Sequence, residues 1–492
     1  MENLMPQKGR SEKEILAELK ELTLKDPDYK NARLWSLVYY LDEHHSSFIN
    51  SAYNMYASAN GLNPTEFKSL KTLENRIIRT AAQLFNGDKN VCGVVTSGGT
   101  ESCLLAVKTY RDYAKDKKNI RKPEMILPET AHVAWLKGAE YFGVKPVFVK
   151  LDKSYKADVN EIKKKINRNT VMLLASAPEY PHGIIDPVME IGSLGEKNGI
   201  PVHVDACVGG FILPFIEKTG KKLPVWDYRV PGVTSISADI HKYGFAAKGA
   251  STITYRNLDY LKYQMFVHQD WPGGVFASPA LLGTRPGGAY AAAWAVLQKF
   301  GMEGYIQLAE QVIKNSENII RGISEIPELE IIGEPAGPIL SYKSVDPYVN
   351  IFAVGDQMEK SGWHIDRLQM PDALHAMITP IHKKAIKHYL EDLKKAVKTV
   401  KEHPELAESG SAATYGMIAH VPFRKMVKKQ VLDLFASMYG PDGGEIDLSD
   451  PSFSADAISS ADGTERSGTG KKAGLLEKII QKYVSRQIKK GK

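Results

Sequence analysis

Short apolar runs alternate with amphipathic segments of helical length over much of the chain. The apolar runs predict β-strands at residues 91–96, 125–127, 146–149, 171–175, 201–204 and 235–238. Apolar positions at helical spacing predict helices between most of these strands, for example at residues 72–84, 100–110 and 190–198. Strands that alternate with helices are joined by crossovers, so the pattern predicts a mostly parallel sheet with helices on both faces.

The pattern changes towards both ends of the chain. Residues 11–60 indicate helices with polar breaks, and two further helices are predicted at 287–300 and 302–323. After these, strand-like runs at 339–342, 349–354 and 376–378 alternate with helices such as 381–401. We therefore expect an α/β protein with this organisation: an N-terminal helical arm (1–60), a large α/β domain (61–315), a small C-terminal α+β domain (316–440), a disordered linker (441–472) and a basic amphipathic helix (473–492).

Composition limits the class of protein further. Of the 492 residues 43% are hydrophobic and 25% are charged, which indicates a large globular core. No run of 18 or more apolar residues occurs, so no transmembrane helix is expected. Three cysteines without a CxxC pair favour neither a disulfide framework nor a zinc site, and we expect no metal. Together with a polar N-terminal segment, these features predict a cytoplasmic protein.

The net charge of +7 is concentrated in one segment. Residues 471–492 hold eight basic residues and one acidic residue, so this tail accounts for the whole excess. A nucleic-acid-binding body would carry its excess on the fold, so no nucleic acid is expected. Apolar residues of the tail recur at helical spacing, which suits peripheral contact with a membrane. A helix that packs on its own dimer or on another protein has the same pattern.

Three polar segments follow predicted strands, where open α/β sheets bind their ligands. Thr96-Ser97-Gly98-Gly99-Thr100 opens a helix, and its backbone suits an anion such as phosphate. Val202-His203-Val204-Asp205 ends a buried strand with an acid, which requires a cationic or hydrogen-bonding partner. Asp239-Ile240-His241-Lys242 follows a strand of small residues, and a desolvated Lys242 would lose its charge readily and form an imine.

Each of these segments also has an ordinary structural explanation. The glycines suit a helix N-cap turn, Asp205 suits a loop cap, and most lysines are solvated. The combination is more informative than its parts. A phosphate loop, an acid for a pyridinium nitrogen and an imine-forming lysine, in this chain order, are what pyridoxal 5'-phosphate requires.

The segments that carry these residues resemble the group II decarboxylase family of pyridoxal-phosphate enzymes. The resemblance runs from about residue 35 to residue 439. The similar segments are Cys92-Gly93-Val94-Val95-Thr96-Ser97-Gly98-Gly99-Thr100-Glu101-Ser102, Ser176-Ala177-Pro178, Pro181-His182-Gly183, Ser237-Ala238-Asp239, His241-Lys242-Tyr243-Gly244, Arg285-Pro286-Gly287-Gly288, Gly362-Trp363 and Tyr415-Gly416-Met417. The resemblance implies the aminotransferase type I fold, a homodimer with shared active sites, and pyridoxal 5'-phosphate bound in the large domain.

The same resemblance implies roles for the cofactor-binding residues. Lys242 would hold the cofactor covalently, and Asp205 would pair with its pyridinium nitrogen. His132 would stack on the ring, although a histidine at a surface helix cap would look the same. Gly99 and Thr100 would bind the cofactor phosphate. By the same resemblance, His241 would lie beside the lysine and Thr284 would reach the phosphate from the partner subunit.

Further residues are assigned to the substrate by resemblance. Lys248 would contact a substrate phosphate or the reacting hydroxyl. Tyr39 and Tyr180 resemble active-site tyrosines, with Tyr39 expected from the other subunit, and Asn60 matches the family pattern. One position departs from the pattern, because Asn63 stands where the family has a histidine associated with substrate phosphate. Asparagine donates hydrogen bonds but carries no charge, which weakens the expectation of a phosphorylated substrate.

The resemblance is greater to a lyase branch of the family than to its decarboxylases. It implies retro-aldol cleavage of a phosphorylated long-chain base, giving a fatty aldehyde and phosphoethanolamine. A decarboxylase for an aromatic or acidic amino acid would use the same Lys242 and Asp205. An alternative from a different class of protein is a cofactor-free scaffold that binds anionic partners through the basic tail.

Overall fold

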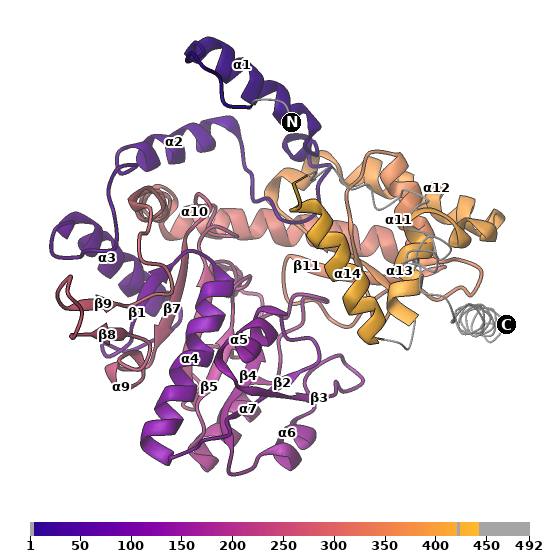
Figure 1. Ribbon diagram of the computed structural model, residues 1–492. Helices are drawn as coiled ribbons and strands as arrows, with labels where there is room; N and C mark the ends of the chain where they lie inside the picture. Colours follow the sequence, from indigo (N-terminus) through magenta and orange to yellow (C-terminus); the bar gives the residue numbers. More distant parts are fainter. Residues whose placement is uncertain (1–3, 421–423, 442–492) are drawn as a thin grey trace, which may run out of the picture.

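A seven-stranded sheet forms the centre of the larger domain in the computed structural model, which describes residues 4–420 and 424–441 (Figure 1). The strand order is β1-β7-β6-β5-β4-β2-β3. The strands are β1 (Cys92–Thr96), β2 (Glu124–Pro128), β3 (Lys145–Val149), β4 (Thr170–Ser176), β5 (Val202–Asp205), β6 (Val233–Asp239) and β7 (Ser251–Tyr255). β7 pairs antiparallel with β1 and β6, and the other neighbours pair parallel. The mostly parallel sheet predicted from the sequence is confirmed.

Helices cover both faces of this sheet, so successive strand residues enter different cores. Val95, Ile126 and Leu173 join one buried cluster, whereas their neighbours Val94 and Met125 join the other. The helices of the large domain are α3 (Lys68–Leu84), α4 (Gly99–Lys118), α5 (Ala134–Phe142), α6 (Val159–Lys165), α7 (Val188–Asn198), α8 (Leu213–Lys218) and α9 (Leu258–Leu261). α3, α7 and α8 pack in the first cluster, and α4 and α5 pack in the second. This double coverage keeps the strand edges that carry the polar segments in a fixed frame.

The smaller domain is built on a four-stranded antiparallel sheet. Its strand order is β10-β11-β13-β12. Its elements are β10 (Leu329–Ile331), β11 (Ile339–Ser344), α11 (Ile351–Lys360), β12 (Asp366–Leu368), β13 (Ala373–Met377), α12 (Ile386–Glu402), α13 (Gly410–His420) and α14 (Arg424–Met438). A separate core holds this domain together and includes Trp35, Trp363 and Tyr389.

Two segments join the domains. α10 (Gly287–Ser324) is a long helix that runs from the large domain into the small one (Figure 1). Its residue Val296 is buried in the large core and Ile319 in the small core. Gly301 leaves the helical conformation with φ 55°, which places a kink where two helices were predicted. The domain boundary that was expected between residues 315 and 316 lies inside this helix.

The N-terminal region supplies the second connection. α1 (Glu12–Leu22) projects away from both domains, and α2 (Glu43–Asn54) packs beside α10 (Figure 1). Between these helices, Leu34 pairs with His364, and the backbone N–H of Met377 donates to the carbonyl of Trp35 at 2.8 Å. The arm is therefore partly built into the small domain rather than being a separate extension.

Several elements differ from the sequence prediction. The strand expected at 349–354 is wrong, because α11 begins at Ile351 and Asn350 caps it by accepting from the N–H groups of Phe352 and Ala353. β7 was not predicted, and it is the one strand that runs against the others in the sheet. A short hairpin of β8 (Phe266–His268) and β9 (Phe276–Ser278) was also not predicted.

The expectations for the C-terminal tail concern residues that the structure does not describe. The linker at 441–472 lies outside the described residues except for residue 441, and the basic helix at 473–492 lies wholly outside them. Within residues 4–420 and 424–441, no helix has the length and apolar character required to cross a bilayer.

Candidate active site

The polar segments after the strands meet at one cavity of about 580 Å³. Residues that follow the carboxyl ends of β1, β4, β5 and β6 line it, because parallel strands present these ends at one edge of the sheet. Leu37 and Met377 contribute from the segments attached to the small domain. The site therefore lies where the two domains meet.

The glycine segment forms the N-terminus of α4 at this cavity. α4 begins at Gly99, so the first N–H groups of the helix have no partner within it and favour an anion. Glu101 fixes the loop, because its carboxylate accepts from the N–H and hydroxyl of Ser97, both at 2.7 Å, and from the N–H of Leu281 at 2.9 Å. Gly99 and Thr100 line the cavity as predicted.

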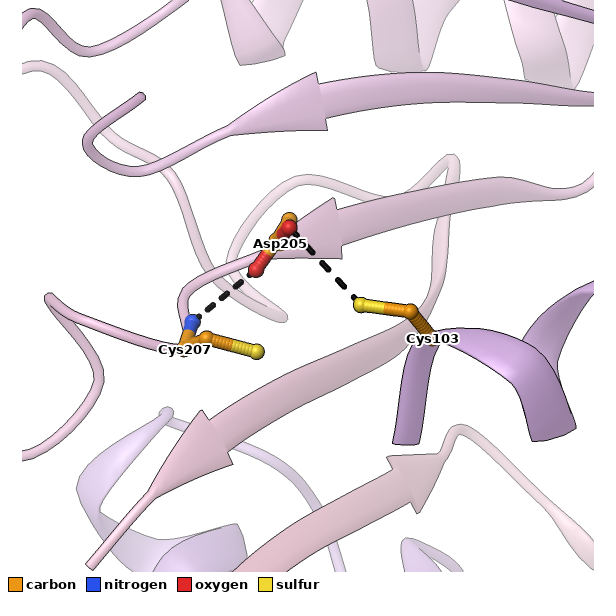
Figure 2. A group of neighbouring side chains, drawn as sticks. All are labelled: Cys103, Asp205 and Cys207. Atoms are coloured by element: carbon orange, nitrogen blue, oxygen red, sulfur yellow. Dashed lines mark hydrogen bonds between the residues drawn. The ribbon is translucent and has the colours of Figure 1, made fainter. Parts of the chain in front are cut away.

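Asp205 stands at the end of β5 with its carboxylate surrounded by donors (Figure 2). One oxygen accepts from the indole N–H of Trp135 at 2.9 Å, and the other accepts from the backbone N–H of Cys207 at 3.1 Å. Burial alone would raise the pKa of Asp205, but His132 and these donors outweigh it and the pKa is lowered. The carboxylate therefore stays charged and can pair with a protonated ring nitrogen.

Two thiols flank the same carboxylate. The thiol of Cys103 on α4 lies 3.9 Å from Asp205 Oδ2 (Figure 2). The thiol of Cys207 lies 3.3 Å from the hydroxyl of Ser237. Burial raises the pKa of the Cys103 thiol to about 11, and the pKa of Cys207 is also raised. Both side chains are therefore neutral thiols beside the charged Asp205 at neutral pH.

Lys242 lies in the cavity and pairs with Asp239, the last residue of β6. Its Nζ is 3.0 Å from Asp239 Oδ2. Burial alone would lower the pKa of Lys242, but Asp239 outweighs it and the pKa is raised. The expectation that burial removes the charge of Lys242 is therefore wrong in this arrangement. Asp239 is also the nearest acceptor for a proton that leaves this amine.

Two histidines of the cavity are kept neutral by burial. His132 lines the wall, and its Nδ1 accepts from the N–H of Ala134 at 3.2 Å. His241 Nδ1 accepts from the N–H of Ala250 at 3.3 Å. Burial lowers the pKa of both rings. Each ring thus presents its remaining N–H as a donor.

Tyr39, Tyr180 and Lys248 line the same cavity. The prediction that Tyr39 comes from the other subunit is contradicted, because Tyr39 lies in the cavity of its own chain. The cause is the anchoring of the preceding Trp35 in the small-domain core. Lys248 donates to the carbonyl of Leu37 at 2.8 Å, and burial together with Lys242 lowers its pKa.

Three predicted residues lie outside this cavity. Asn60 bonds to the hydroxyl of Thr284 at 3.2 Å, and neither of them lines the cavity of its own chain. Asn63 lines a different cavity of about 230 Å³, where its side chain accepts from the N–H of Thr65 at 3.0 Å. The single chain thus leaves a partner-subunit role for Thr284 open and gives Asn63 no contact with the main cavity.

Sequence reasoning assigned no role to several residues that shape the site. Asp239 carried a local signal, since it ends a strand of small residues three positions before Lys242. Glu101 and Trp135 act through contacts across the fold, which no local pattern shows. Asp366 accepts from Tyr180, 186 residues earlier in the chain, so spacing could not have indicated it.

The fold and the cavity define the chain as a pyridoxal-dependent enzyme. Residues 36–345 match the pyridoxal-dependent decarboxylase conserved domain. Among solved structures, a glutamate decarboxylase from Lactobacillus brevis superimposes with a TM-score of 0.72 over 82% of this chain and 96% of that chain. Its sequence identity of 18% supports the fold alone.

More specific relatives are known. Sphingosine-1-phosphate lyase 1 of Rattus norvegicus is 41% identical over 89% of this chain and 77% of its own length. The Arabidopsis thaliana lyase is 43% identical over 81% and 74%. The structure of a Burkholderia pseudomallei sphingosine-1-phosphate lyase aligns with a TM-score of 0.80 and 32% identity over 88% of this chain and 96% of that chain. The chain belongs to the sphingosine-1-phosphate lyase family and is a pyridoxal-phosphate-dependent lyase.

The residues of the cavity fit this cofactor. Asp205 offers a charged acceptor for the ring nitrogen, Lys242 an amine for the aldehyde, and the N-terminus of α4 donors for the phosphate. The backbone must approach closely here, because a Cβ at Gly99 would lie 2.7 Å from Asp239 Oδ2 and 2.8 Å from the Cys207 sulfur. The chemistry that the cofactor supplies is acceptance of the electron pair from the bond that breaks.

Proposed function

We propose that the chain cleaves the C2–C3 bond of a phosphorylated long-chain base and releases a fatty aldehyde and phosphoethanolamine. The observation that carries this proposal is the 36–44% identity to several sphingosine-1-phosphate lyases over most of the chain. The cavity provides suitable groups, since Lys248 and two tyrosines accompany Lys242 and Asp205.

The chain's own residues have distinct tasks in this reaction. Lys242 binds the cofactor, and Asp239 at 3.0 Å holds the proton that the lysine must lose. Asp205 would pair with a protonated ring nitrogen, because its own pKa is lowered and its carboxylate is charged. His132 would cover the ring, and Lys248 would contact substrate oxygens. Their position in the cavity wall supports these two roles.

An assay with two products tests the reaction type. The protein, loaded with pyridoxal 5'-phosphate, is given a phosphorylated long-chain base in one sample and glutamate or an aromatic amino acid in others. Aldehyde from the first without carbon dioxide from the others supports the lyase. Carbon dioxide without aldehyde would show that the chain is a decarboxylase on this fold.

The phosphate requirement is tested with the unphosphorylated base. Asn63 lies outside the cavity of its own chain, so only a position in the partner's site would let it affect substrate phosphate. We therefore expect Asn63→His to tighten the phosphorylated substrate only in the dimer. Equal cleavage of both bases by the wild type would contradict recognition of phosphate.

We also infer that two copies of the chain share their active sites. Exposed apolar side chains support this inference, since no residue of α1 is buried and Leu16 is 65% exposed. The β8–β9 hairpin exposes Trp271 (54%) and Val275 (75%) close in sequence to Thr284. From the sequence, we further propose a cytoplasmic location and peripheral membrane contact through residues 473–492.

A further inference from the structure

Asp366 lies directly behind a tyrosine of the cavity wall. The hydroxyl of Tyr180 donates to Asp366 Oδ2 at 2.9 Å. Tyr180 follows β4 of the large domain, and Asp366 begins β12 of the small domain. The bond thus connects the cavity with a residue of the other domain.

The direction of this bond decides what Tyr180 can do in the cavity. An ionised carboxylate only accepts hydrogen bonds, and a tyrosine hydroxyl has one proton to donate. Since Tyr180 gives that proton to Asp366, only its lone pairs remain for a substrate. A substrate hydroxyl at this position must therefore donate to Tyr180.

The other groups of the cavity are less suited to accept that proton. Lys242 pairs with Asp239 at 3.0 Å and would hold the cofactor, and the amine of Lys248 donates to the carbonyl of Leu37 at 2.8 Å. Tyr39 donates to the sulfur of Met377 at 3.7 Å, and no carboxylate among residues 4–420 and 424–441 accepts from it. Tyr180 differs from these groups because a base lies behind it.

We propose that Tyr180 and Asp366 form a relay that removes the proton from the C3 hydroxyl of the substrate. The hydroxyl proton passes to the Tyr180 oxygen while the proton of Tyr180 passes to Asp366 Oδ2. The C2–C3 bond breaks, its electron pair stays with C2, and C3–O becomes the carbonyl of the aldehyde. Asp366 ends the step protonated and Tyr180 is unchanged. Asp366 is thus a positioning residue that acts through Tyr180.

Packing holds both members of the relay in place. The ring of Tyr180 stacks on His375 with centroids 4.5 Å apart, and His375 bonds to the carbonyl of Pro181 at 3.1 Å. The hydroxyl of Ser36 donates to the other oxygen of Asp366 at 3.2 Å. These contacts fix the distance across which the proton moves.

The arginine next to Asp366 is paired with other carboxylates. The next residue, Arg367, points its guanidinium at Asp356 (2.5 Å) and Glu359 (2.7 Å) instead. His364, His375 and Tyr415 are the other titratable groups that face this region. Among the described residues, no lysine or arginine forms an ion pair with Asp366.

A second cavity gives the proton a way out. It has a volume of about 410 Å³ and is lined by Asp366, Tyr180 and Leu37, of which the last two also line the main cavity. Water in this second cavity can take the proton from Asp366 without entering the reaction site. The relay therefore separates proton release from the bond that breaks.

A double-mutant cycle tests the relay in the loaded enzyme. Asp366→Asn keeps an acceptor for Tyr180 but cannot hold the proton, and Tyr180→Phe removes the hydroxyl. Because general-base catalysis contributes on the order of 10²–10⁴-fold, we expect each variant to lose at least about 100-fold in kcat with KM changed only a few-fold. The double variant should be no slower than the slower of the two single variants, because both substitutions break the same relay. Losses that multiply, or an Asp366→Asn kcat within about twofold of wild type, would overturn the relay.

Two further variants separate a proton relay from a structural role. Asp366→Ala opens space beside the second cavity, so formate should restore kcat there but not in Asp366→Asn, where the amide fills the position. His364→Gln is the matched control, because His364 is exposed and lines the second cavity, whereas the hydrogen-bond partners of Asp366 are Tyr180 and Ser36. It should keep wild-type kcat. Failure of formate to raise kcat in Asp366→Ala, with an unchanged Tm and visible cofactor band, would also overturn the proposal.

The relay rests on the proposed lyase reaction. The wild-type sample distinguishes failure of that reaction from failure of the relay. If the wild type gives no aldehyde from the phosphorylated base, the proposed function fails. If the wild type gives aldehyde and Asp366→Asn does so equally fast, only the relay fails.

Discussion

At the scale of single residues, two of the buried carboxylates that line the cavity have different partners. Asp205 accepts from the N–H groups of Trp135 and Cys207. Asp239 has its charge opposite Lys242. The first carboxylate would therefore be available to the ring nitrogen of the cofactor, and the second would hold the proton of the amine.

Lys242→Ala should abolish covalent attachment of the cofactor. The variant lacks the amine, so the visible absorbance band of the loaded protein should disappear and borohydride should fix no cofactor to the chain. Activity should fall below detection. Lys248→Ala is the matched control, because it removes the second amine of the cavity and should leave the band in place. A borohydride-stable adduct in Lys242→Ala would show that another residue anchors the cofactor.

His203 should make the large domain sensitive to acid. This buried ring bonds to the hydroxyls of Ser235 and Ser237, and burial lowers its pKa to about 4 from 6.5. The folded protein binds fewer protons than the unfolded chain between these values. Its contribution to stability is therefore complete above pH 6.5 and is lost as the pH falls towards 4, by roughly 3 kcal/mol.

Urea unfolding of the cofactor-saturated protein at several pH values measures this effect. His203→Gln should flatten the fall of the unfolding free energy between pH 6.5 and 4, even if it lowers the value at pH 7. His268→Gln, at an exposed position in β8, should keep the wild-type slope. An unchanged slope in His203→Gln would assign the acid sensitivity to other groups.

Residues of the site could be predicted from the sequence where each one follows its own strand. Asp205, Lys242 and the Gly99 loop carry such local signals, and the sheet brings them to one edge. Asp366 could not be found this way, because it reaches Tyr180 only after the small domain folds against the large one. Tyr39 was assigned to the wrong subunit for the same reason.

At the scale of elements, the start of α4 is the most tightly constrained part of the site. Gly99→Ala should strain it, since the new Cβ would meet Asp239 and Cys207 at 2.7 and 2.8 Å. Both neighbours are buried and cannot move aside cheaply, so we expect the cofactor-free protein to lose about 1–3 kcal/mol of unfolding free energy.

Gly98→Ala is the matched control for this position. Its Cβ would have its nearest atom, on His241, at 3.7 Å, which is an ordinary contact. Thermal unfolding of the two cofactor-free variants compares them directly. A Tm of Gly99→Ala equal to that of Gly98→Ala would contradict the constraint.

The hydrophobic pattern was sufficient to predict some of the elements but not others. The parallel strands β2 and β4 are buried over almost their whole length and appear as continuous apolar runs, so they could be predicted. β7 (Ser251–Tyr255) has serine or threonine at three of its five positions, so its sequence did not indicate a buried strand. In α11 the apolar run after Asn350 was mistaken for a strand because the capping side chain was not considered.

At the scale of the whole molecule, the basic tail should act separately from the catalytic body. The chain should pellet with vesicles that contain phosphatidylserine, because each basic residue near an anionic surface contributes about 1 kcal/mol. A version that ends at Tyr439 should stay in solution, and added salt should release the full chain. Equal pelleting of both versions, or binding that salt does not change, would contradict an electrostatic membrane contact.

Sedimentation of the full chain and of a version without α1 tests the dimer. We expect the full chain to sediment as a dimer, and loss of α1 to weaken it. The truncated chain should start at residue 28, because removal of residues 1–60 would also remove Trp35 from the small-domain core. An active monomer would contradict the shared site.

Lys242→Ala and Thr284→Glu supply the two defects for the mixing experiment. The first removes the amine, and the second places a negative charge against the cofactor phosphate. If Thr284 serves the neighbouring subunit, a mixed dimer has both defects in one site and an intact second site, so refolding the variants together restores activity. If Thr284 serves its own chain, each site keeps one defect and activity stays absent. Since Thr284 does not line the cavity of its own chain, we expect restoration, to about one quarter of wild-type activity per subunit for random pairing.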